Sequence, residues 1–496
     1  MKVMFVYSAF ENIGIEYLSA VLRRRGFETR IAFDPRIFSD QFIKIKYLDR
    51  VFNYENLLLY KIKDYNPSLI VFSVVSADYS WSLSLARKIK NFTSMHITFG
   101  GIHPSSAPEE VISHDCVDSV ILGEGELALL ELAESIKNNQ SDKSIENIWF
   151  KEKGRIIKNS IRPYIEDLDS LPFPDKELYY REIPGYRTGY TIITRRGCVN
   201  NCSFCHNTVW QKLYPNGKRI RMRSIGNVLE ELRQAKRKYN FKLLRINDDL
   251  FTSDKGWLKE FARQYKQEIC VPLYCFGSPS TVDEEIIGYL KDCGCYQLCL
   301  GVQSVNSRVN NEIFHRYEPI ERAKEAIDLC RKYRIRVVVD NIIGFPGQAE
   351  SHFLETAQFY AKNKVSRICI FWLVYYPGTD ILTIAKDRGV LSEEAVINIA
   401  ARPIESANTL CNIINSNHSQ RFCLFLELYN FIPLPIFRWM LKHRLYRLLP
   451  NINPSFISYF YTLFAKDRLD IPRRRYYIRY ARYIPVILLW KVKNIK

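Results

Sequence analysis

Apolar runs alternate with amphipathic segments over the first 140 residues. Five short aliphatic or β-branched runs predict buried strands, at residues 3–8, 28–33, 68–75, 96–101 and 119–123. Between and after them, apolar residues recur at helical spacing, as at residues 15–25 and 126–137. Strands that alternate with helices predict a parallel, doubly wound sheet, so residues 1–140 are expected to form a Rossmann-like α/β domain.

The predicted strands of this domain end in small residues. At or just beyond their carboxyl ends stand Ser8, Ser73, Ser76, Gly100, Gly101 and Gly123. A doubly wound sheet binds its ligand in the crevice outside these ends. Small residues there allow the close approach of a large, flat or phosphorylated ligand, although Gly100-Gly101 taken alone is equally well explained as a turn.

A second alternation of strands and helices follows a connector. Residues 165–179 contain two prolines and several acids without a period, which is typical of an extended segment within a linker, 141–187. Residues 188–392 then predict a partial (β/α)6 barrel, with strands at 190–195, 242–248, 272–277, 297–302, 336–345 and 367–376. Polar or small residues end these strands at one mouth: Asp248 and Asp249, Gly277 and Ser278, Gln303 and Ser304, Gly344, and Tyr375 and Tyr376.

The alternation ends after Ser392, and residues 393–496 predict a mainly helical region that is basic and rich in aromatics. Residues 421–496 hold 15 Lys/Arg and 3 Asp/Glu, so +12 of the net charge of +18 lies there. The longest charge-free apolar run, Leu428 to Phe437, contains two prolines and is shorter than the roughly 18 residues of a membrane span.

Arginines 473–475, 479 and 482 stand among tyrosines and leave three interpretations open. They can belong to a helical cap over the barrel mouth with a solvated basic face, or to a cap that also contacts an anionic membrane surface. The third interpretation is a contact with RNA through phosphates and stacking.

The use of cysteine indicates a reducing compartment. The first apolar run has no small-residue cleavage site and is interpreted as a buried strand rather than a signal peptide. Thirteen cysteines without such a signal indicate reduced thiols in the cytoplasm, some of them metal ligands.

Three cysteines directly after the first barrel strand carry the strongest chemical signal. Cys198, Cys202 and Cys205 have the spacing C-x3-C-x2-C. Three thiolates in eight residues can hold one face of a [4Fe–4S] cubane and leave the fourth iron without a protein ligand. A zinc site usually pairs two ligands with two more further along, and no such second pair stands out. His206 follows directly and is interpreted as non-ligating, because a fourth ligand would block the open iron.

The cysteine loop and the barrel resemble the radical S-adenosylmethionine (SAM) superfamily. The stretches that carry the resemblance are TGYTIITRRGCVNNCSFCHN (188–207), INDDLFT (246–252), CGCYQLCLGVQSVN (293–306), NIIGFPGQ (341–348) and YYPGTD (375–380). It implies that SAM binds the open iron and is cleaved to methionine and a 5′-deoxyadenosyl radical. It also implies a set of SAM contacts: Phe204 near the adenine, Asp248 or Asp249 at the methionyl amine, Gln303 and Ser304 at the ribose or methionyl group, and Gly344 and Tyr376 on the adenine side.

The first 140 residues resemble the cobalamin-binding domain of cobalamin-dependent radical SAM enzymes. FGGIHPS (99–105), VDSVILGEGE (117–126) and the serine-rich loop after the third strand carry this resemblance. The loop at 8–14 lacks the histidine that ligates cobalt in other cobalamin proteins, so this loop is not expected to ligate it. His103 is interpreted as a loop residue near the nucleotide tail.

The resemblance implies a methyltransferase that acts on an unactivated carbon of a small-molecule or lipid-like substrate. The alternative is a cyclase or rearrangement enzyme built from the same parts. An RNA-modifying methylthiotransferase is disfavoured, because only Cys116 precedes Cys198 where such enzymes carry a second three-cysteine cluster. The expected partners are a reducing protein such as flavodoxin or ferredoxin and, through the basic C-terminal region, a membrane surface; nucleic acid is not expected.

Overall fold

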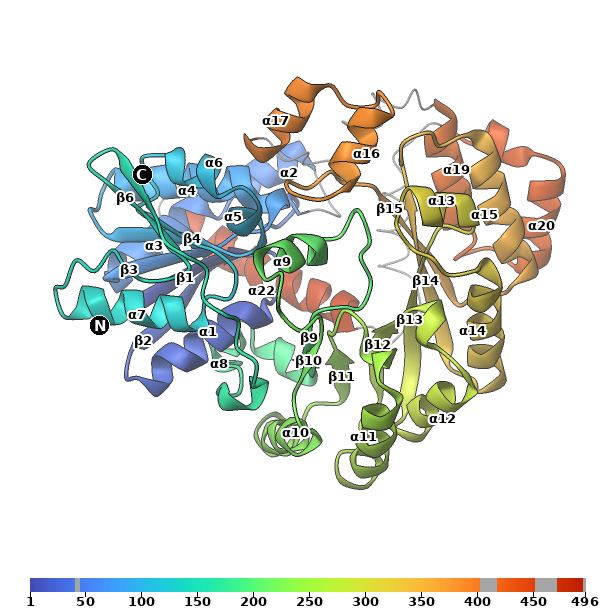
Figure 1. The fold of residues 1–496 in the computed structure, drawn as a ribbon, viewed down its shortest axis with the longest axis horizontal. Coiled ribbons are helices and arrows are strands. Elements are labelled where there is room, and N and C mark those ends of the chain that lie inside the picture. The colour runs from blue at the N-terminus through green and yellow to red at the C-terminus, as the bar shows by residue number, and fades with distance from the viewer. Residues whose placement is uncertain (41–44, 402–416, 451–470, 494–496) are drawn as a thin grey trace.

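The computed structural model describes residues 1–40, 45–401, 417–450 and 471–493 of the chain. Within them two sheets lie side by side, one from the N-terminal third of the chain and one from its middle (Figure 1). Each sheet has a large buried apolar core of its own. The α/β class predicted from the alternation of strands and helices is confirmed.

The first sheet has seven strands in the order β2-β1-β3-β4-β5-β6-β7, of which β1 to β5 are parallel and correspond to the five predicted strands. The strands are β1 (Lys2–Ser8), β2 (Glu28–Asp34), β3 (Leu69–Ser73), β4 (His96–Gly100), β5 (Ser119–Ile121), β6 (Ile148–Glu152) and β7 (Arg155–Lys158). The helices are α1 (Ile13–Arg24), α2 (Lys46–Val51), α3 (Glu55–Tyr65), α4 (Tyr79–Lys90), α5 (Ile102–Ser106), α6 (Pro108–Ser113) and α7 (Glu126–Lys137).

The antiparallel hairpin β6–β7 extends this sheet into the segment that the sequence analysis assigned to a linker. Only Ile148 and Phe150 of its nine strand residues are buried. A hairpin that buries so few residues gives only a weak apolar signal, which explains why the sequence pattern did not predict it.

The second sheet is the open barrel, with six parallel strands in the order β15-β14-β13-β12-β11-β8. Its strands, all six of them predicted, are β8 (Gly189–Ile192), β11 (Leu243–Ile246), β12 (Leu273–Gly277), β13 (Cys295–Gln303), β14 (Arg336–Ile343) and β15 (Arg367–Trp372). Its helices are α9 (Asn207–Leu213), α10 (Ile225–Tyr239), α11 (Lys255–Glu268), α12 (Glu284–Asp292), α13 (Ser307–Glu312), α14 (Ile320–Lys332) and α15 (Glu350–Lys362). α8 (Glu177–Tyr180) precedes the barrel, and β9 (Arg195–Arg196) and β10 (Arg221–Met222) form a separate two-stranded ribbon.

The barrel helices begin where the sequence offers capping side chains. Ser224, Asp254 and Asp283 each accept a hydrogen bond from the backbone N–H three residues further on, at the starts of α10, α11 and α12. Such caps satisfy backbone donors that have no partner within the helix.

The described C-terminal helices are α16 (Ile381–Asp387), α17 (Glu393–Ala401), α19 (Asn417–Leu428), α20 (Leu434–Lys442) and α22 (Ile471–Lys493). In this described part of the chain, none of the helices is both long enough and apolar enough to cross a bilayer. α19 and α20 pack beside α15, and α22 lies behind the two sheets in the view of Figure 1.

Side chains of this C-terminal region cap both edge strands of the barrel sheet. After α19, the Asn430 amide donates to Ile368 O at 3.0 Å and accepts from Ile368 N at 2.9 Å, so it takes the place of a further strand beside β15. At the opposite edge, Arg475 of α22 donates to Gly189 O of β8 at 2.8 Å. Exposed strand edges invite pairing with other chains, and these contacts blunt both edges.

α22 is fixed to the first domain by buried ion pairs. Arg475 pairs with Glu11, and Arg479 pairs with Asp40 and donates to Ala9 O. Arg479 is only 1% exposed. The surface position expected for Arg475 and Arg479 is therefore wrong, because acids of the first domain lie opposite them.

The remaining arginines of this run differ in position. Arg474 and Arg482 are exposed, and the side chain of Arg473 lies outside the described residues. Tyr476 and Tyr483, two of the tyrosines among these arginines, are buried, and Tyr483 packs in the apolar core of the first domain.

A further buried cluster joins the first domain, the linker and α22. Lys176 Nζ lies 2.6 Å from Glu16 Oε2 and 3.7 Å from Glu11 Oε1, and Arg475 pairs with Glu11 from the other side. Burial raises the pKa of Glu16 well above its usual range. For Glu11 burial acts in the same direction, but Arg475 and Lys176 outweigh it and lower the pKa, so Glu11 is the charged carboxylate of the two.

Arg479→Leu should lower the free energy of unfolding by about 3–5 kcal/mol, because it removes the cation that pairs with buried Asp40. Urea unfolding followed by fluorescence measures this loss. Arg482→Leu, on the same helix but exposed, is the matched control and should stay within about 0.5 kcal/mol of the wild type. Equal effects of the two substitutions would contradict the buried ion pair.

Candidate functional site

The candidate site lies at the barrel mouth, where residues 197–206, here called the cluster loop, follow β9. Gly197 begins the loop with a positive φ of 94°. A Cβ at this position would lie 2.0 Å from Arg219 O, so only glycine lets the loop pass this closely. The backbone therefore fixes where the loop starts.

The three predicted cluster cysteines lie together in this loop. Cys202 is buried, and Cys198 and Cys205 are partly exposed. The three thiols are close enough for their charges to act on one another, and Cys205 N donates to Cys202 O at 3.0 Å. Burial raises the pKa of all three thiols, that of Cys205 to about 12. They ionise at neutral pH only when a bound cation stabilises the thiolates, as iron does.

The donor set suits a cubane better than a single ion. In the described residues no three His, Cys, Asp or Glu side chains are gathered around one point as ligands of a single ion would be. A cubane needs no such gathering, because each thiolate binds a different iron. The three thiols of one loop therefore fit a [4Fe–4S] cluster.

Arg316 is a site residue that the sequence analysis missed. Its Nη1 donates to Cys202 Sγ at 3.6 Å, and its Nη2 donates to Ser278 Oγ at 2.7 Å and Gly301 O at 2.8 Å. It is 8% exposed and lies in the loop before α14. The same guanidinium pairs with Glu318, so its positive charge is shared between this carboxylate and the cluster loop. No spacing in the sequence relates it to the cysteines, because the fold alone brings the two loops together.

The two predicted aspartates have different surroundings. Asp248 is buried, accepts hydrogen bonds from Thr194 N at 2.7 Å and Arg195 N at 3.3 Å, and pairs with Arg195. Asp249 is exposed, accepts from Asn207 Nδ2 at 3.1 Å, and interacts electrostatically with Cys198 and Cys205. Desolvation nevertheless raises the pKa of Asp249, a combination expected of a side chain that faces a concave surface. Asp249 is thus the aspartate that is free to meet a ligand at the cluster loop.

Gln303 and Ser304 lie at an irregularity of the sheet. The register between β13 and β14 shifts between Gly301 and Gln303, and Gln303 has a φ of 64°. A bulge of this kind re-aims a side chain, and non-glycine residues adopt a positive φ rarely. Ser304 accepts from Asn306 N at 3.1 Å and is mostly buried.

The residues predicted on the adenine side also contact the cluster loop or the sheet beside it. The Tyr376 ring lies 4.4 Å from that of His206. Phe204 packs edge-on against Phe314 at 5.2 Å. Gly344 has a φ of 79°, and a Cβ there would lie 2.9 Å from the Trp372 ring.

The predicted cobalamin residues form one connected edge of the first sheet. Val74 N, next to Ser73, donates to Gly100 O at 2.7 Å, and Gly123 N donates to Ser105 Oγ at 3.0 Å. Gly101 has a φ of 101°, and a Cβ there would lie 3.0 Å from Val74 N and O. These contacts are made within the protein, so the approach of a ligand to these small residues stays a prediction. Ser8 and Ser76, in contrast, use their hydroxyls within the domain, on Asp78 at 2.9 Å and on His103 at 3.1 Å.

His103 lies inside the first domain. Its side chain is fully buried, its Nδ1 contacts Ser76, and its ring lies 4.1 Å from that of Tyr79. Burial lowers its pKa to about 3, so the imidazole is neutral. In the loop at 8–14, Asn12 caps α1 and Glu11 belongs to the buried ion pairs.

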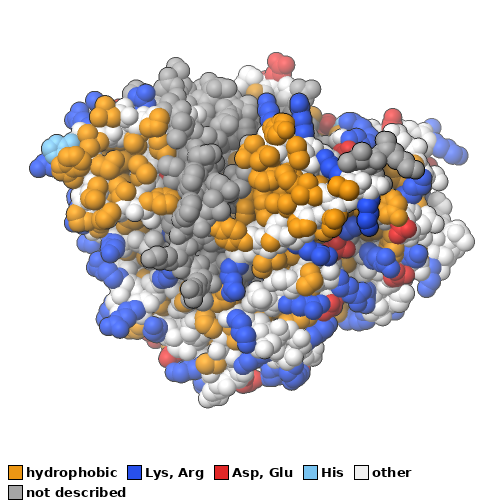
Figure 2. All heavy atoms as spheres, turned by 180° about the vertical axis from the view of Figure 1, so that it is seen from behind, with side chains coloured by type: hydrophobic (Ala, Val, Ile, Leu, Met, Phe, Trp, Pro, Cys, Tyr) orange, Lys and Arg blue, Asp and Glu red, His pale blue; other side chains and the backbone are white. Residues whose placement is uncertain are grey.

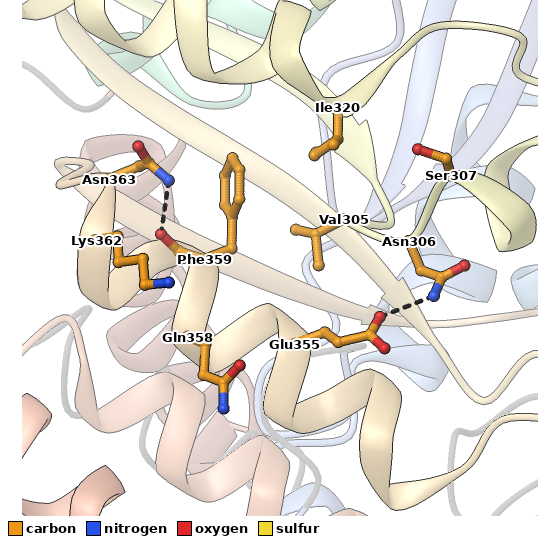
Figure 3. A pocket seen from close by; sticks show the side chains of 9 residues that line it. All are labelled: Val305, Asn306, Ser307, Ile320, Glu355, Gln358, Phe359, Lys362 and Asn363. Carbon is orange, nitrogen blue, oxygen red and sulfur yellow. Dashed lines mark hydrogen bonds between the residues drawn. The ribbon is translucent and has the colours of Figure 1, made fainter.

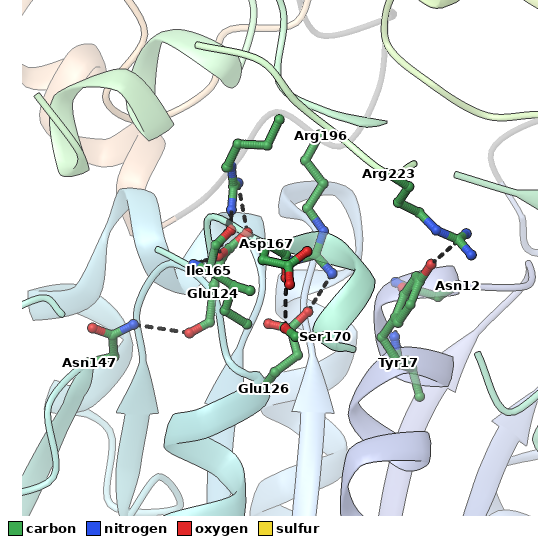
Figure 4. Close-up of polar contacts among 12 residues, drawn as sticks. Asn12, Tyr17, Glu124, Glu126, Asn147, Ile165, Asp167, Ser170, Arg196 and Arg223 are labelled. Carbon is green, nitrogen blue, oxygen red and sulfur yellow. Dashed lines mark hydrogen bonds and ion pairs between the residues drawn. The ribbon is translucent and has the colours of Figure 1, made fainter. Parts of the chain in front are cut away.

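A cluster of ion pairs, here called the Glu124 cluster (Glu124, Glu126, Arg196 and Arg221), joins the two sheets directly beside the site (Figure 4). Arg196, one residue before the cluster loop, donates to Glu124 at 2.8 Å and to Glu126 at 2.6 Å. Arg221 binds Glu124 with two nitrogens, at 2.8 and 3.0 Å. β9 and β10 pair Arg196 with Arg221, so the ribbon places both guanidiniums beside one carboxylate.

Glu124 is held in its charged form. Burial raises its pKa, but Arg196 and Arg221 outweigh burial and lower it below its usual range. Its backbone N–H donates to Tyr214 OH at 2.9 Å, so a barrel-side aromatic also covers the end of β5. Both glutamates lie in the stretch VDSVILGEGE (117–126), but no spacing in the sequence indicates their partners.

One open pocket, of about 380 Å³, lies on the barrel between the loop after β13 and helices α14 and α15 (Figure 3). Its lining is Val305, Asn306, Ser307, Ile320, Glu355, Gln358, Phe359, Lys362 and Asn363. None of the predicted cluster, SAM or cobalamin residues lines it, so it is separate from the candidate site.

Comparison with known proteins gives two family matches. The family model of the Radical SAM superfamily matches residues 192–360, and that of the B12 binding domain matches residues 5–133. An uncharacterized methyltransferase of Pyrococcus horikoshii is 26% identical over 324 residues, which cover 64% of this chain and 69% of the relative. Cytidylyl-2-hydroxyethylphosphonate methyltransferase of Streptomyces wedmorensis is 25% identical over 383 residues, covering 67% of this chain and 69% of the relative.

The fold is also similar to that of a solved structure. The radical SAM methyltransferase TsrM from Kitasatospora setae, with cobalamin and a [4Fe-4S] cluster bound, matches with a TM-score of 0.66 and 17% identity. The match covers 98% of this chain and 99% of that one, so both sheets and their arrangement are shared.

Cys198→Ala, Cys202→Ala and Cys205→Ala should each abolish the cluster of anaerobically reconstituted protein, because a cubane with one protein ligand fewer is not retained. Iron content and the electron paramagnetic resonance signal of the reduced protein measure this. Cys270→Ala is the matched control, since this exposed cysteine lies outside the cluster loop, and it should keep about four irons. An unchanged signal in the triple alanine variant would place the cluster elsewhere.

Arg196→Gln should destabilise the contact between the two sheets by about 2–4 kcal/mol, below the full loss of a buried pair because Arg221 still binds Glu124. The urea midpoint and the rate of proteolysis in the segment between the sheets measure it. Lys218→Gln breaks the exposed pair with Glu166 and should change stability by less than about 1 kcal/mol. Because the pKa of Glu124 is lowered in the folded protein, its contribution should persist at neutral pH and be lost as the pH falls below about 4.

Proposed function

Because this chain belongs to the cobalamin-dependent radical SAM enzymes, we propose that it is a methyltransferase acting on an unactivated carbon of a small-molecule or lipid-like substrate. Its cofactors are a [4Fe–4S] cluster, SAM and cobalamin. The two curated relatives reported above are both named as methyltransferases, and this supports methyl transfer over cyclisation or rearrangement.

The observation that carries the proposal is the position of one ion pair, Glu124 with Arg196. Each of its two residues is the sequence neighbour of one of the two proposed cofactor edges. Gly123, at the cobalamin edge, precedes Glu124, and Arg196 precedes Gly197, the first residue of the cluster loop. The two sites therefore adjoin the same contact from opposite sides. Methyl transfer through both cofactors needs them near one substrate, and this arrangement suits that requirement.

The cluster, when bound, supplies the electron that cleaves SAM, and cobalamin carries the methyl group. Cys198, Cys202 and Cys205 are proposed to hold three irons. Asp249 is proposed to accept a hydrogen bond from the methionyl amine, and Arg316 stands where a cation offsets the charge of a thiolate or a carboxylate.

The remaining predicted residues orient and enclose SAM. Gln303 lies at the irregularity of β13. Together with Ser304 it is proposed to contact the ribose or methionyl group. Phe204 and Tyr376 are proposed to enclose the adenine beside Gly344. The aromatic group of Phe204, Phe314 and Phe345 excludes water from one side of the cluster loop.

The carboxyl ends of β1, β3, β4 and β5 are proposed to hold cobalamin, with Ser8, Ser73, Ser76, Gly100, Gly101 and Gly123 at its contacts. At Gly101 a Cβ would lie 3.0 Å from Val74 N and O, and at Gly123 it would lie 2.0 Å from the Tyr214 hydroxyl, so both positions need glycine for packing within the protein. No histidine lies in the loop at 8–14, so cobalt is proposed to lack a histidine ligand from this loop.

A one-electron donor such as flavodoxin or ferredoxin is the proposed protein partner, and the cytoplasm is the proposed compartment. The thiols of the cluster loop need reducing conditions to stay available for iron. The exposed Lys and Arg side chains suit an acidic electron carrier.

The test follows the methyl group without knowledge of the substrate. Protein reconstituted with iron, sulfide and cobalamin is given a reductant and SAM labelled in its methyl group. Label should move into the protein-bound cobalamin fraction, and 5′-deoxyadenosine should form only when the three cysteines are intact. The Cys198→Ala variant is the control for 5′-deoxyadenosine formation, because this substitution removes the cluster and leaves the first sheet unchanged. Formation of 5′-deoxyadenosine without label in the cobalamin fraction would reject methyl transfer and leave a radical enzyme of another type.

A further inference from the structure

Two of the C-terminal helices expose large apolar side chains on the face of the molecule seen in Figure 2. On and after α20 these are Ile436, Trp439, which is 56% exposed, and Leu448, which is 80% exposed. On the last turns of α22, Leu489 and Val492 are 62% and 68% exposed. Figure 2 shows two hydrophobic patches, over α20 and over α22, on the same face.

These side chains are not needed to hold the helices in place. The inner face of α20 already buries Phe437, and the inner face of α22 buries Tyr483 and Ile487. Both helices are thus apolar on two sides, one toward the protein and one toward solvent. Exposed apolar patches on two helices that are already anchored by their buried faces indicate an interaction site rather than a stability feature.

The exposed charges carried by α20, α22 and the residues just after α20 are of one sign, although Arg447 pairs with Glu350 of α15 at 3.3 Å. Exposed basic residues surround them: Arg438, Lys442, Arg444 and Arg447 beside the α20 patch, and Arg474, Arg482 and Lys493 on α22. Among the described residues from 417 to 450 and from 471 to 493, the one carboxylate is Glu427, which is buried. The surface therefore suits an occupant that is anionic and also accepts apolar side chains.

We propose that this face lies on an anionic lipid bilayer, with α20 and the end of α22 at the interface. Trp439 offers an indole of the kind that settles at the headgroup level, and aliphatic side chains such as Leu489 and Val492 enter the acyl boundary. The lysines and arginines reach the phosphates while their stems cover apolar surface.

The lipid surface fits better than the other anionic partner considered for this region. Single-stranded nucleic acid is bound by aromatic side chains that stack on bases, and the α22 patch is aliphatic at Leu488, Leu489 and Val492. Arg475 and Arg479, which belong to the run for which RNA contact was one of three open interpretations, pair with Glu11 and Asp40 inside the protein. The proposed contact with lipid therefore depends on the exposed basic residues and not on Arg475 and Arg479.

The proposal does not depend on the reaction, so it is tested with the full-length protein and vesicles alone. Wild-type protein should co-sediment with phosphatidylcholine vesicles that contain phosphatidylserine and not with pure phosphatidylcholine vesicles. Retention should fall with salt, since exposed charges are screened within about 8 Å near physiological ionic strength.

Two variants separate the charged and apolar contributions. The triple variant Lys442→Gln, Arg444→Gln, Arg482→Gln should bind acidic vesicles about 100-fold more weakly at low salt, since each charge near the surface contributes about fivefold. Lys259→Gln, Lys291→Gln, Lys324→Gln on α11, α12 and α14 removes equal charge from exposed positions on the barrel helices and should bind like the wild type. Trp439→Ser with Leu489→Ser should lose the retention that persists at high salt, while Ile397→Ser, equally exposed on α17, should not.

Three results would overturn the proposal. One is no retention of the wild type on acidic vesicles at low salt. Another is equal weakening by the two triple variants, which would reveal a general effect of charge. The third is self-association through this face, detected as a dimer by sedimentation that Trp439→Ser with Leu489→Ser abolishes, without binding to vesicles. Circular dichroism confirms that each variant is folded, so loss of binding is not loss of structure.

Discussion

The pairing of Arg196 with two carboxylates of the neighbouring domain is the contact on which the site depends. Arg196 precedes the cluster loop, and Glu124 and Glu126 follow the strand end predicted to lie beside cobalamin. Apolar contact alone would hold two sheets together without fixing their relative position. Charged hydrogen bonds are directional. The contact of two Arg221 nitrogens with Glu124 further restricts the orientation of the two parts. The relative position of the two cofactor edges is thereby set by a few side chains.

The remaining contacts between parts of the chain follow the same principle. Lys176 of the linker and Arg475 of α22 both pair with Glu11, and Arg479 pairs with Asp40. Each pair carries a desolvation cost, which good geometry and further hydrogen bonds to backbone carbonyls offset. Such pairs specify one arrangement among those that apolar burial would allow.

The sequence predicted the strands and the cysteine loop well, because both are local patterns. Strands β1 to β5 and the six barrel strands are short runs rich in aliphatic and β-branched residues, and the cysteine spacing needs no knowledge of the fold. The hairpin β6–β7 was missed because it buries only two of its strand residues. Arg316 was missed because its contact with Cys202 joins loops 114 residues apart.

The basic C-terminal helix shows where a sequence pattern is ambiguous. A run of arginines and tyrosines has the same composition whether it faces lipid or a buried acid. Only the position of Glu11 and Asp40 across the interface decides that Arg475 and Arg479 turn inward while Arg474 and Arg482 turn outward. Similarly, the sequence does not show which of the adjacent residues Asp248 and Asp249 has a structural role and which can meet a ligand. The structure shows that Asp248 is already bound by Thr194 and Arg195.

The capping of both barrel edges by C-terminal side chains has a consequence for synthesis on the ribosome. β8 is made early, yet the arginine that covers its free edge is encoded almost 300 residues later, and Asn430 follows β15 by some 60 residues. Until α22 emerges, the β8 edge of the nascent barrel sheet lacks its contact with Arg475, and Glu11 and Asp40 lack the cations of α22. The growing chain therefore passes through a long interval in which this strand edge is uncovered. Slow translation of the segment that contains α22 would lengthen that interval and make the yield of folded enzyme depend on chaperones that bind exposed strands.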